Sequence, residues 1–296
     1  VEDLKKLNDE LMKYEPSEII CNEAFLVSGF DVNDLKSRLH ISVNALESHM
    51  FDDDGCRRIL MKHFKVNTLI GLGVEEFPTG LLAAGALLQY LYDTQKTDLE
   101  HFTHIYPYLT SKYMLLDSST RRNLELTETL REKQKRGSLL WVLDKTKTAM
   151  GARLLRNYIE QPLIEKDEME KRLDAIQELN QDSISRDEIR EYLNPIYDLE
   201  RLLSKVTYKT ANPRDLIAFR NSLQMLPPIK TVLSAFEKEE LTKIREQIDG
   251  LEDIYQLIDE AIIDEPPLSI REGGMIKDQF DETIDRLRSA KHDGKQ

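Results

Sequence analysis

Apolar side chains in the first third of the chain alternate between two spacings, which predicts alternating helices and strands. Leu4, Leu7 and Leu11 lie three and four residues apart, so they would share one face of a helix. Short runs rich in Ile, Val and Cys follow at residues 18–25 and 40–46. Such short apolar runs are typical of buried strands. We therefore expect a helix and then two strands separated by further structure.

Three further helices are expected in this region. Asn33 can cap a helix that runs to Leu39, and Thr79 can cap a long Leu- and Ala-rich helix over residues 80–94. Between them, Asp52 to Asp54 precede another helix, because acidic groups suit the positive end of the helix dipole. The order helix, strand, helix, strand and two helices is typical of the back half of an α/β domain.

Beyond about residue 115 the apolar spacing is helical almost throughout. The clearest start signal is Asn212-Pro213-Arg214-Asp215, in which Asn caps the helix, Pro takes the first helical position and Asp lies in the first turn. Pro227-Pro228 is expected to kink or stop the helix that this signal opens. The region is therefore predicted to be an α-helical domain with no strand after Met114. Helical apolar spacing is found at residues 117–126, 139–143, 148–161, 169–179, 189–206, 216–226, 251–262 and 280–287.

The composition bounds the class of protein. The chain has 296 residues, enough for two domains, and a formal charge of −13, which argues against indiscriminate binding to nucleic acid. Its two cysteines, Cys21 and Cys56, are too few for a disulfide framework, so we expect a cytoplasmic protein. We expect neither a membrane span, which needs roughly 18–20 apolar residues, nor a signal peptide. The chain begins at Val1 and stops just after a helical pattern, so we expect it to be a segment of a longer protein.

No motif for chemistry emerges from the residue spacing. A phosphate-binding loop needs Gly-x-x-x-x-Gly-Lys-Ser/Thr, and the pair Gly294-Lys295 lacks both the first glycine and the hydroxyl. Gly71-x-Gly73 lacks the third glycine of a dinucleotide site. His101 and His104 are three residues apart, but their segment is expected to be extended, so a metal site is disfavoured. Helix capping accounts for Asp52 to Asp54. We expect no catalytic, cofactor-binding or metal-binding residue.

A basic run stands out in this acidic chain. Between Arg131 and Arg156 there are eight Lys or Arg residues against Glu132 and Asp144. The run could face a phosphate backbone, where each neutralised phosphate adds salt-dependent affinity. It could also form a solvated helix face or ion pairs with an acidic neighbouring domain, and we favour these interpretations. Trp141 could stack on bases, but it lies in an apolar run and is expected in the core. The interdomain or phosphate-facing candidates are Arg121, Arg122, Arg131, Lys133, Lys135, Arg136, Lys145, Lys147 and Arg153.

Longer blocks of the sequence resemble the MutS family of DNA mismatch repair proteins. They occur in the family's order between about residues 80 and 280, which makes the resemblance far more specific than any short motif. The blocks are LLAAGALLQYL (81–91), LDSSTRRNLEL (116–126), GSLLWVLDKTKTAMGARLLRNYIEQPL (137–163), IYDLERLLSKV (196–206), ANPRDLIAFRNSL (211–223) and DEPPLSIREGGMIKD (264–278).

The resemblance implies a multidomain fold of an α/β part and an all-α part. Residues 1–97 would be the C-terminal part of the connector domain, an α/β domain with an RNase H-like fold. Residues 98–275 would be the helical core domain. Residues 276–296 would start the lever helix toward the DNA clamp.

The resemblance also implies what this chain lacks. The family's mismatch-reading domain, with its Phe-x-Glu wedge, is expected before Val1, and Phe280-Asp281-Glu282 is a chance match to that motif. The clamp and the ATPase are expected after Gln296. No catalytic or mismatch-contacting residue can therefore be carried onto this sequence. We expect no enzyme activity or cofactor here, whereas the intact protein would be a DNA-dependent ATPase that uses ATP and Mg²⁺.

The expected role is to transmit conformational change between the mismatch-binding or clamp domains and the ATPase domains. The partners implied by the resemblance are mismatched double-stranded DNA, bound through the intact protein, a MutL-type repair protein, bound through the connector, and a second copy in a homodimer. The alternative is a helical DNA-binding or protein-docking module that uses the basic run 131–156.

Overall fold

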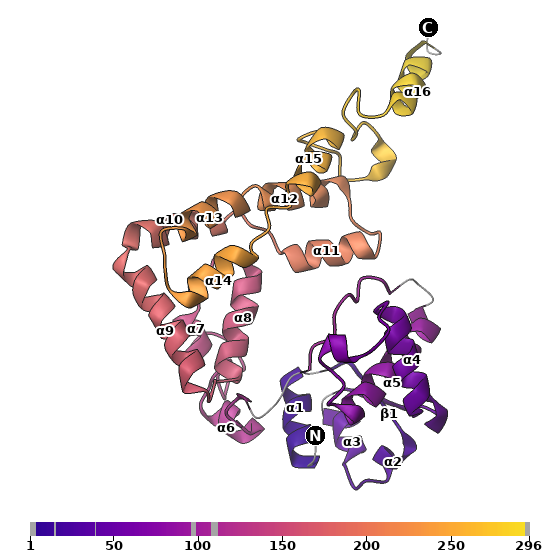
Figure 1. Ribbon diagram of the computed structural model, residues 1–296, viewed down its shortest axis with the longest axis vertical. Coiled ribbons are helices and arrows are strands. Elements are labelled where there is room, and N and C mark those ends of the chain that lie inside the picture. Colours follow the sequence, from indigo (N-terminus) through magenta and orange to yellow (C-terminus); the bar gives the residue numbers. More distant parts are fainter. Residues whose placement is uncertain (1–3, 15, 39, 96–98, 108–111, 294–296) are drawn as a thin grey trace. The chain divides into compact units, whose positions relative to one another are not determined.

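The computed structural model describes residues 4–14, 16–38, 40–95, 99–107 and 112–293. The chain divides into two compact units, residues 1–123 and 124–296 (Figure 1). The first unit combines a small sheet with helices, and the described part of the second has no named strand. The expected change from an α/β part to a helical part is therefore confirmed.

The sheet of the first unit has two parallel strands, β1 (Glu18–Cys21) and β2 (Ser42–Ala45). Parallel strands need a crossover, and two helices supply it, α2 (Glu23–Leu26) and α3 (Val32–Arg38). Leu35 of α3 is buried in a cluster with residues of both strands. The other elements of this unit are α1 (Leu4–Tyr14), η1 (Ser48–Phe51), α4 (Asp53–His63), η2 (Ile70–Leu72), α5 (Pro78–Gln95) and α6 (Ser118–Asn123).

Local capping moves several boundaries away from their predicted positions. The strand expected at 18–25 is shorter because the Asn22 side chain accepts a hydrogen bond from the Phe25 amide at 3.0 Å and starts α2. Asp31, and not Asn33, caps α3, since its carboxylate accepts from the Asp34 amide at 3.0 Å. Leu39, the expected end of this helix, lies outside the described residues.

Two later boundaries in this unit also differ from the prediction. α5 begins at Pro78, earlier than a cap at Thr79 would allow. The helix expected at 117–126 is α6, and it ends at Asn123. Asp117 caps it, because the Thr120 amide donates to the Asp117 carboxylate at 2.7 Å. Asp117 is therefore the N-cap of α6.

The core of the first unit depends on the close approach of α4 to α5. Gly85 of α5 lies against Cys56 of α4, and a Cβ added at Gly85 would stand 2.4 Å from the Cys56 Cβ. His63, at the end of α4, extends this packing to the chain after α5. Its Nε2 donates to the Phe102 carbonyl and its Nδ1 bonds the Tyr92 hydroxyl, both at 2.7 Å.

The described part of the second unit has ten α-helices, the short 3-10 helix η4 (Ile270–Glu272) and two apolar clusters. One cluster joins α9, α10, α13 and α14, and the other joins α11, α12 and α15. Figure 1 shows these two groups, with α16 in yellow at the end of the unit. The helices are α7 (Leu139–Leu143), α8 (Ala149–Glu160), α9 (Lys166–Gln181), α10 (Ser183–Leu193), α11 (Leu199–Thr207), α12 (Pro213–Leu223), α13 (Leu226–Leu233), α14 (Glu239–Gln247), α15 (Glu252–Ala261) and α16 (Glu282–Asp293).

The predicted start of α12 is confirmed in detail. The Asn212 side chain accepts from the Asp215 amide at 2.9 Å, and the Asp215 carboxylate accepts from the Asn212 amide at 3.0 Å. This reciprocal capping box satisfies two amides that have no partner within the helix. Pro227-Pro228 takes the first turn of α13, so these prolines open a helix after α12 has ended at Leu223.

We predict that Gly85→Ala destabilises the first unit by about 3 kcal/mol, because the new methyl group would overlap Cys56 and force α4 and α5 apart. Gly80→Ala in the same helix is the matched control. Its Cβ would lie 3.5 Å from the Phe77 Cβ, an ordinary contact, so stability should be unchanged or slightly higher. Amide hydrogen exchange of α4 and α5 measures the effect. Equal protection in both variants would contradict the packing argument.

Candidate functional site

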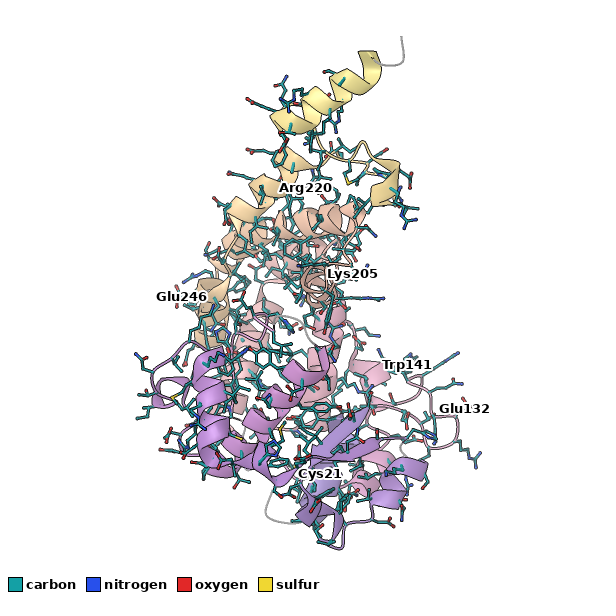
Figure 2. All side chains as sticks on the ribbon, turned by 90° about the vertical axis from the view of Figure 1, so that its right-hand side faces the viewer. Cys21, Glu132, Trp141, Lys205, Arg220 and Glu246 are labelled. Atoms are coloured by element: carbon teal, nitrogen blue, oxygen red, sulfur yellow. The ribbon has the colours of Figure 1, made fainter. Side chains whose placement is uncertain are left out.

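The most connected charged group in the second unit is Arg220, in the last turn of α12 (Figure 2). Its side chain is 12% exposed. Nη1 donates to the Asp259 carboxylate of α15 at 2.8 Å and to the Asp264 carboxylate, in the segment after α15, at 2.9 Å. Nε and Nη2 donate to the Asn221 side chain at 3.3 and 3.2 Å. One guanidinium therefore joins α12, α15 and the following loop.

The Arg220 guanidinium also controls the charge of Asp264. Its hydrogen bond, and then its charge, lowers the pKa of the Asp264 carboxyl, and the nearby Lys277 acts in the same direction. The lowered pKa favours the ionised carboxylate, which makes the contact with Arg220 a charge-assisted hydrogen bond. Such bonds are shorter and stronger than neutral ones.

The loop between α15 and α16 is closed at its base. Ile262 and Ile276 form an antiparallel bridge, and the Ile263 amide donates to the Met275 carbonyl at 3.0 Å. The Lys277 ammonium donates to the Asp259 carbonyl at 2.6 Å. Residues 264–274 are thus a loop whose two ends are fixed to each other and to the end of α15.

α16 is held to this closed base by Arg288. Its Nη1 donates to the Asp278 carboxylate and its Nη2 to the Ile276 carbonyl, both at 2.7 Å. A guanidinium that bonds two acceptors at once fixes direction as well as distance, because its donors are coplanar. Arg220 and Arg288, with the carboxylates they bind, define what we call the charged junction. It links α12, α15 and α16 through side chains that lie far apart in the sequence.

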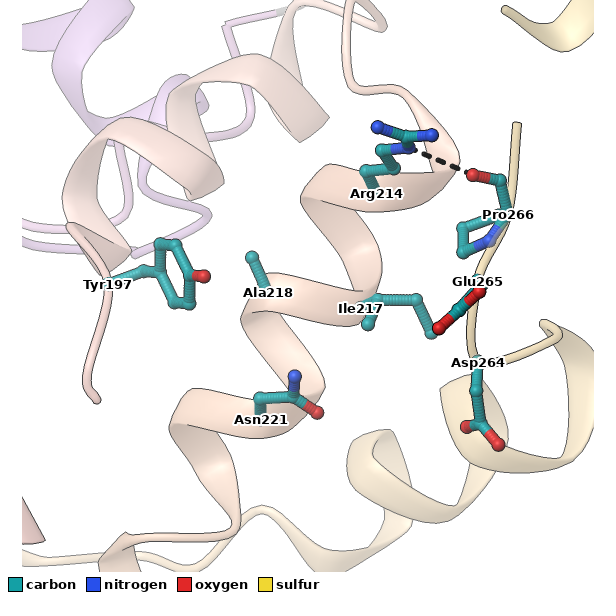
Figure 3. Close-up of a pocket in the computed structure, with 8 residues that line it drawn as sticks. All are labelled: Tyr197, Arg214, Ile217, Ala218, Asn221, Asp264, Glu265 and Pro266. Atoms are coloured by element: carbon teal, nitrogen blue, oxygen red, sulfur yellow. Dashed lines mark hydrogen bonds between the residues drawn. The ribbon is translucent and has the colours of Figure 1, made fainter. Parts of the chain in front are cut away.

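A pocket of about 370 Å³ adjoins the charged junction (Figure 3). One wall is α12, and the opposite wall is the segment 264–266. The Arg214 Nε donates to the Pro266 carbonyl at 2.9 Å and holds this segment against α12. The lining residues are Tyr197, Arg214, Ile217, Ala218, Asn221, Asp264, Glu265 and Pro266. They include no Ser, Cys or His, and across the described residues no group of three His, Cys, Asp or Glu side chains could hold a metal ion.

The predicted basic candidates are placed in both units. Arg121 and Arg122 lie in α6 of the first unit, and the Arg121 Nε is buried without a hydrogen-bond partner. Lys135 pairs with Asp144, and Arg153 pairs with Asp198 at 2.8 Å and with Glu200 at 2.5 Å. The remaining five are exposed, and no carboxylate within the described ranges pairs with them: Arg131, Lys133, Arg136, Lys145 and Lys147. Their interdomain or phosphate-facing role stays a prediction.

The expectation that Trp141 lies in the core is wrong. Its side chain is 48% exposed, and Leu140 is the residue of α7 that is buried. A five-residue helix can turn only part of its surface inward, so an entirely apolar sequence does not bury every side chain. Figure 2 marks Trp141 in the second unit.

No local pattern in the sequence predicted the pairings of the charged junction. Arg220 lies 39 residues before Asp259 and 44 before Asp264, and nothing in the local spacing relates them. Arg220, Asp264 and Asp278 lie in blocks that carry the family resemblance, 211–223 and 264–278, whereas Asp259 and Arg288 lie outside them. These blocks indicated the region of the charged junction but did not predict its contacts.

The chain thus combines an α/β unit with an all-helical unit that contains the charged junction, which is the architecture of a multidomain protein. The described residues contain no cluster of side chains that could hold a metal ion. Family models identify both parts. Residues 1–103 match MutS domain II, and residues 119–292 match MutS domain III. The chain therefore belongs to the MutS family. Within the residues that the structure describes, no helix is both long and apolar enough to cross a membrane.

The similar curated proteins are each described as DNA mismatch repair protein MutS. The protein of Lachnoclostridium phytofermentans is 59% identical over 295 residues, covering 100% of this chain and 32% of the relative. That of Ruminiclostridium cellulolyticum is 48% identical, covering 98% and 33%, and that of Acetivibrio thermocellus is 44% identical, also covering 98% and 33%. The chain thus spans about a third of the length of these relatives.

We predict that Arg220→Ala lowers the free energy of unfolding of the second unit by about 1–2 kcal/mol, because Asp259 and Asp264 lose their shared donor. The cost stays below that of a fully buried pair, since both carboxylates can reach water. Arg271→Ala, at an exposed arginine of the loop, is the control and should change stability by less than about 0.5 kcal/mol. Urea unfolding followed by Trp141 fluorescence, which reports only on this unit, measures both. Equal midpoints would contradict the role of Arg220.

We predict a pH-dependent contribution from Asp144. The Lys135 ammonium and then the Thr146 hydroxyl bond its carboxylate and lower its pKa from 3.8 to about 2. Because the folded value lies below the unfolded one, the contribution is present above about pH 4 and is lost as the pH falls toward 2. We expect about 1 kcal/mol, since Lys135 is half exposed. Urea midpoints measured between pH 5 and pH 2 should fall more steeply in the original protein than in Asp144→Asn, and parallel curves would refute the prediction.

Proposed function

We propose that this chain is the connector and core segment of a longer DNA mismatch repair protein and that it transmits conformational change between other domains of that protein. One end of the coupling would be the domains that bind mismatched DNA, including the clamp. The other end would be the domains that bind and hydrolyse ATP. The observation that carries the proposal is the charged junction, in a chain that belongs to the MutS family.

In this proposal the parts of the chain have separate roles. Residues 1–97 are the C-terminal part of an RNase H-like connector, which the parallel pair β1–β2 and the helices around it support. Residues 98–275 are the helical core. Residues 276–296 begin the lever helix that leads to the clamp, and the described part of that helix is α16.

The charged junction gives the proposal a physical basis. If α16 rotates, it must either carry the closed loop base and α15 with it or break the two hydrogen bonds of Arg288. Asp278 is 87% exposed, so its ion pair with Arg288 contributes about 1 kcal/mol or less. The part-buried hydrogen bond from the charged guanidinium to the Ile276 carbonyl contributes roughly 1.5–3 kcal/mol. Allosteric coupling free energies are typically about 1–3 kcal/mol, so this contact is strong enough to carry such a coupling.

The longer protein would supply the chemistry and the partners. We propose that it is a cytoplasmic, DNA-dependent ATPase that uses ATP and Mg²⁺, binds mismatched duplex DNA and works as a homodimer. The connector would be the contact for a MutL-type repair protein. The segment itself would hold no cofactor and catalyse no reaction.

The test replaces Arg288 in the full-length protein that carries this chain. We predict that Arg288→Ala reduces the effect of ATP on mismatch affinity severalfold, because α16 loses its fixed direction. Arg286→Ala is the matched control, since Arg286 is an exposed arginine of the same helix for which the described residues supply no carboxylate partner. Equilibrium binding to mismatched duplex, with and without ATP, gives the coupling.

Two results decide between transmission and a purely structural role. If Arg288→Ala leaves the ATP effect unchanged while the protein stays folded, the proposal is wrong. If Arg288→Lys, which keeps the charge but loses the planar pair of donors, leaves the coupling as low as Arg288→Ala does, the directional contact of Arg288 is supported; coupling at the original level would show that charge alone suffices.

A further inference from the structure

The helix α7 exposes an apolar surface at the protein's most basic segment. Leu139, Trp141, Val142 and Leu143 are 43%, 48%, 56% and 50% exposed. In a helix with 3.6 residues per turn these four side chains occupy one continuous arc, and Leu140 faces the opposite, buried side. We call these four residues the α7 patch. A soluble domain rarely leaves such large adjacent side chains in water without a use for them.

The α7 patch is held in a fixed shape by its ends. Ser138, 1% exposed, caps α7 by accepting from the Trp141 amide at 3.2 Å, and its hydroxyl donates to the Lys135 carbonyl at 2.7 Å. Lys135, before the helix, pairs with Asp144, after it. Gly137 has a positive φ of 96°, a backbone conformation that would be strained in a residue with a side chain. A surface built this way loses little conformational entropy when a partner binds, which favours affinity.

Unneutralised cations flank the α7 patch on both sides. Because Lys135 contacts Asp144, the chain segments that carry Arg136 and Lys145 lie close to each other. Lys147 follows, and Arg131 and Lys133 lie in the preceding loop. All five are exposed, and none has a carboxylate partner in the described part of the chain. In a protein of net charge −13 this is a local surplus of positive charge.

We propose that the α7 patch and its flanking cations dock an acidic protein segment that carries aliphatic or aromatic side chains. The apolar residues of such a segment would cover Trp141 and Val142, and its carboxylates would meet Arg136, Lys145 and Lys147. Duplex DNA satisfies the cations but leaves three aliphatic side chains in contact with phosphate or water. A lipid surface is disfavoured because α7 has only five residues, too few for a helix that lies in the interface. The surface is distinct from the charged junction, so this inference does not rest on the proposed transmission.

Trp141 is the only tryptophan, so its fluorescence reports on this surface alone. The probe is a synthetic acidic amphipathic peptide of about 16 residues without tryptophan, with Leu and Phe at helical spacing and Glu elsewhere. Titrated into the protein, it should shift the Trp141 emission to shorter wavelength with micromolar affinity that weakens as salt is raised. A scrambled peptide of the same composition should bind at least about tenfold more weakly, because its apolar side chains no longer share a face.

Variants separate the two halves of the surface. Lys145→Glu together with Lys147→Glu, or Val142→Asp alone, should each weaken peptide binding at least about tenfold. Lys243→Glu, at an exposed lysine of α14, and Leu173→Asp, at a leucine of α9 that is 62% exposed, are the matched controls and should stay within about twofold. All five positions are exposed, so the variants should fold.

Several outcomes would overturn the inference. No blue shift at millimolar peptide, or equal loss in the control variants, would show that the surface does not select this chemistry. Tighter binding to duplex DNA or to anionic vesicles would assign it to another class of partner. A blue shift that depends on protein concentration alone would indicate a second copy as the occupant. Trp141 emission that is already blue and shielded from acrylamide without peptide would mean that the protein itself covers the patch.

Discussion

The second unit depends on one shared guanidinium. Arg220 binds Asp259 and Asp264 with the same nitrogen, and these carboxylates belong to α15 and to the loop that leads to α16. An arginine so little exposed to water needs partners that satisfy its donors, because an unpaired charge there would be costly. Arg220 therefore fixes where α15 ends and where the loop begins. The position of α16 follows from this, since Arg288 attaches it to the base of the same loop.

The two units use different physical means to hold their helices together. In the first, α4 and α5 approach so closely that Gly85 leaves room only for Cys56. In the second, polar side chains join helices across apolar clusters. Glu178 of α9, for example, accepts from the Glu237 and Lys238 amides at 3.0 Å each and so caps the start of α14. Close packing favours a single arrangement, whereas discrete charged contacts can be broken and remade one at a time. The second means is compatible with the proposed transmission of conformational change.

The charge distribution of the second unit gives its surfaces separate roles. Arg153, within the basic run, is neutralised by Asp198 and Glu200 and ties α8 to the start of α11. The cations around α7 have no such partners in the described residues, and the apolar side chains between them are exposed. The basic run therefore has two parts. Some of its cations form ion pairs within the unit, and the others are exposed without a carboxylate partner in the described residues. The stability of this unit accounts only for the cations that form ion pairs.

The sequence by itself determined the order and the type of most elements. Apolar periodicity and capping residues are local signals, so they predicted α1, α4, the two strands and the start of α12 at Asn212, and longer blocks of sequence indicated the family. Boundaries were less certain, because Asn22 and Asp31 compete with their neighbours for the same backbone amides. Only the tertiary structure decided which charges pair and which apolar side chains are buried. The pairing of Arg220 with Asp259 and the exposure of Trp141 both depend on which segments meet in space. The spacing of residues along the chain does not determine these contacts.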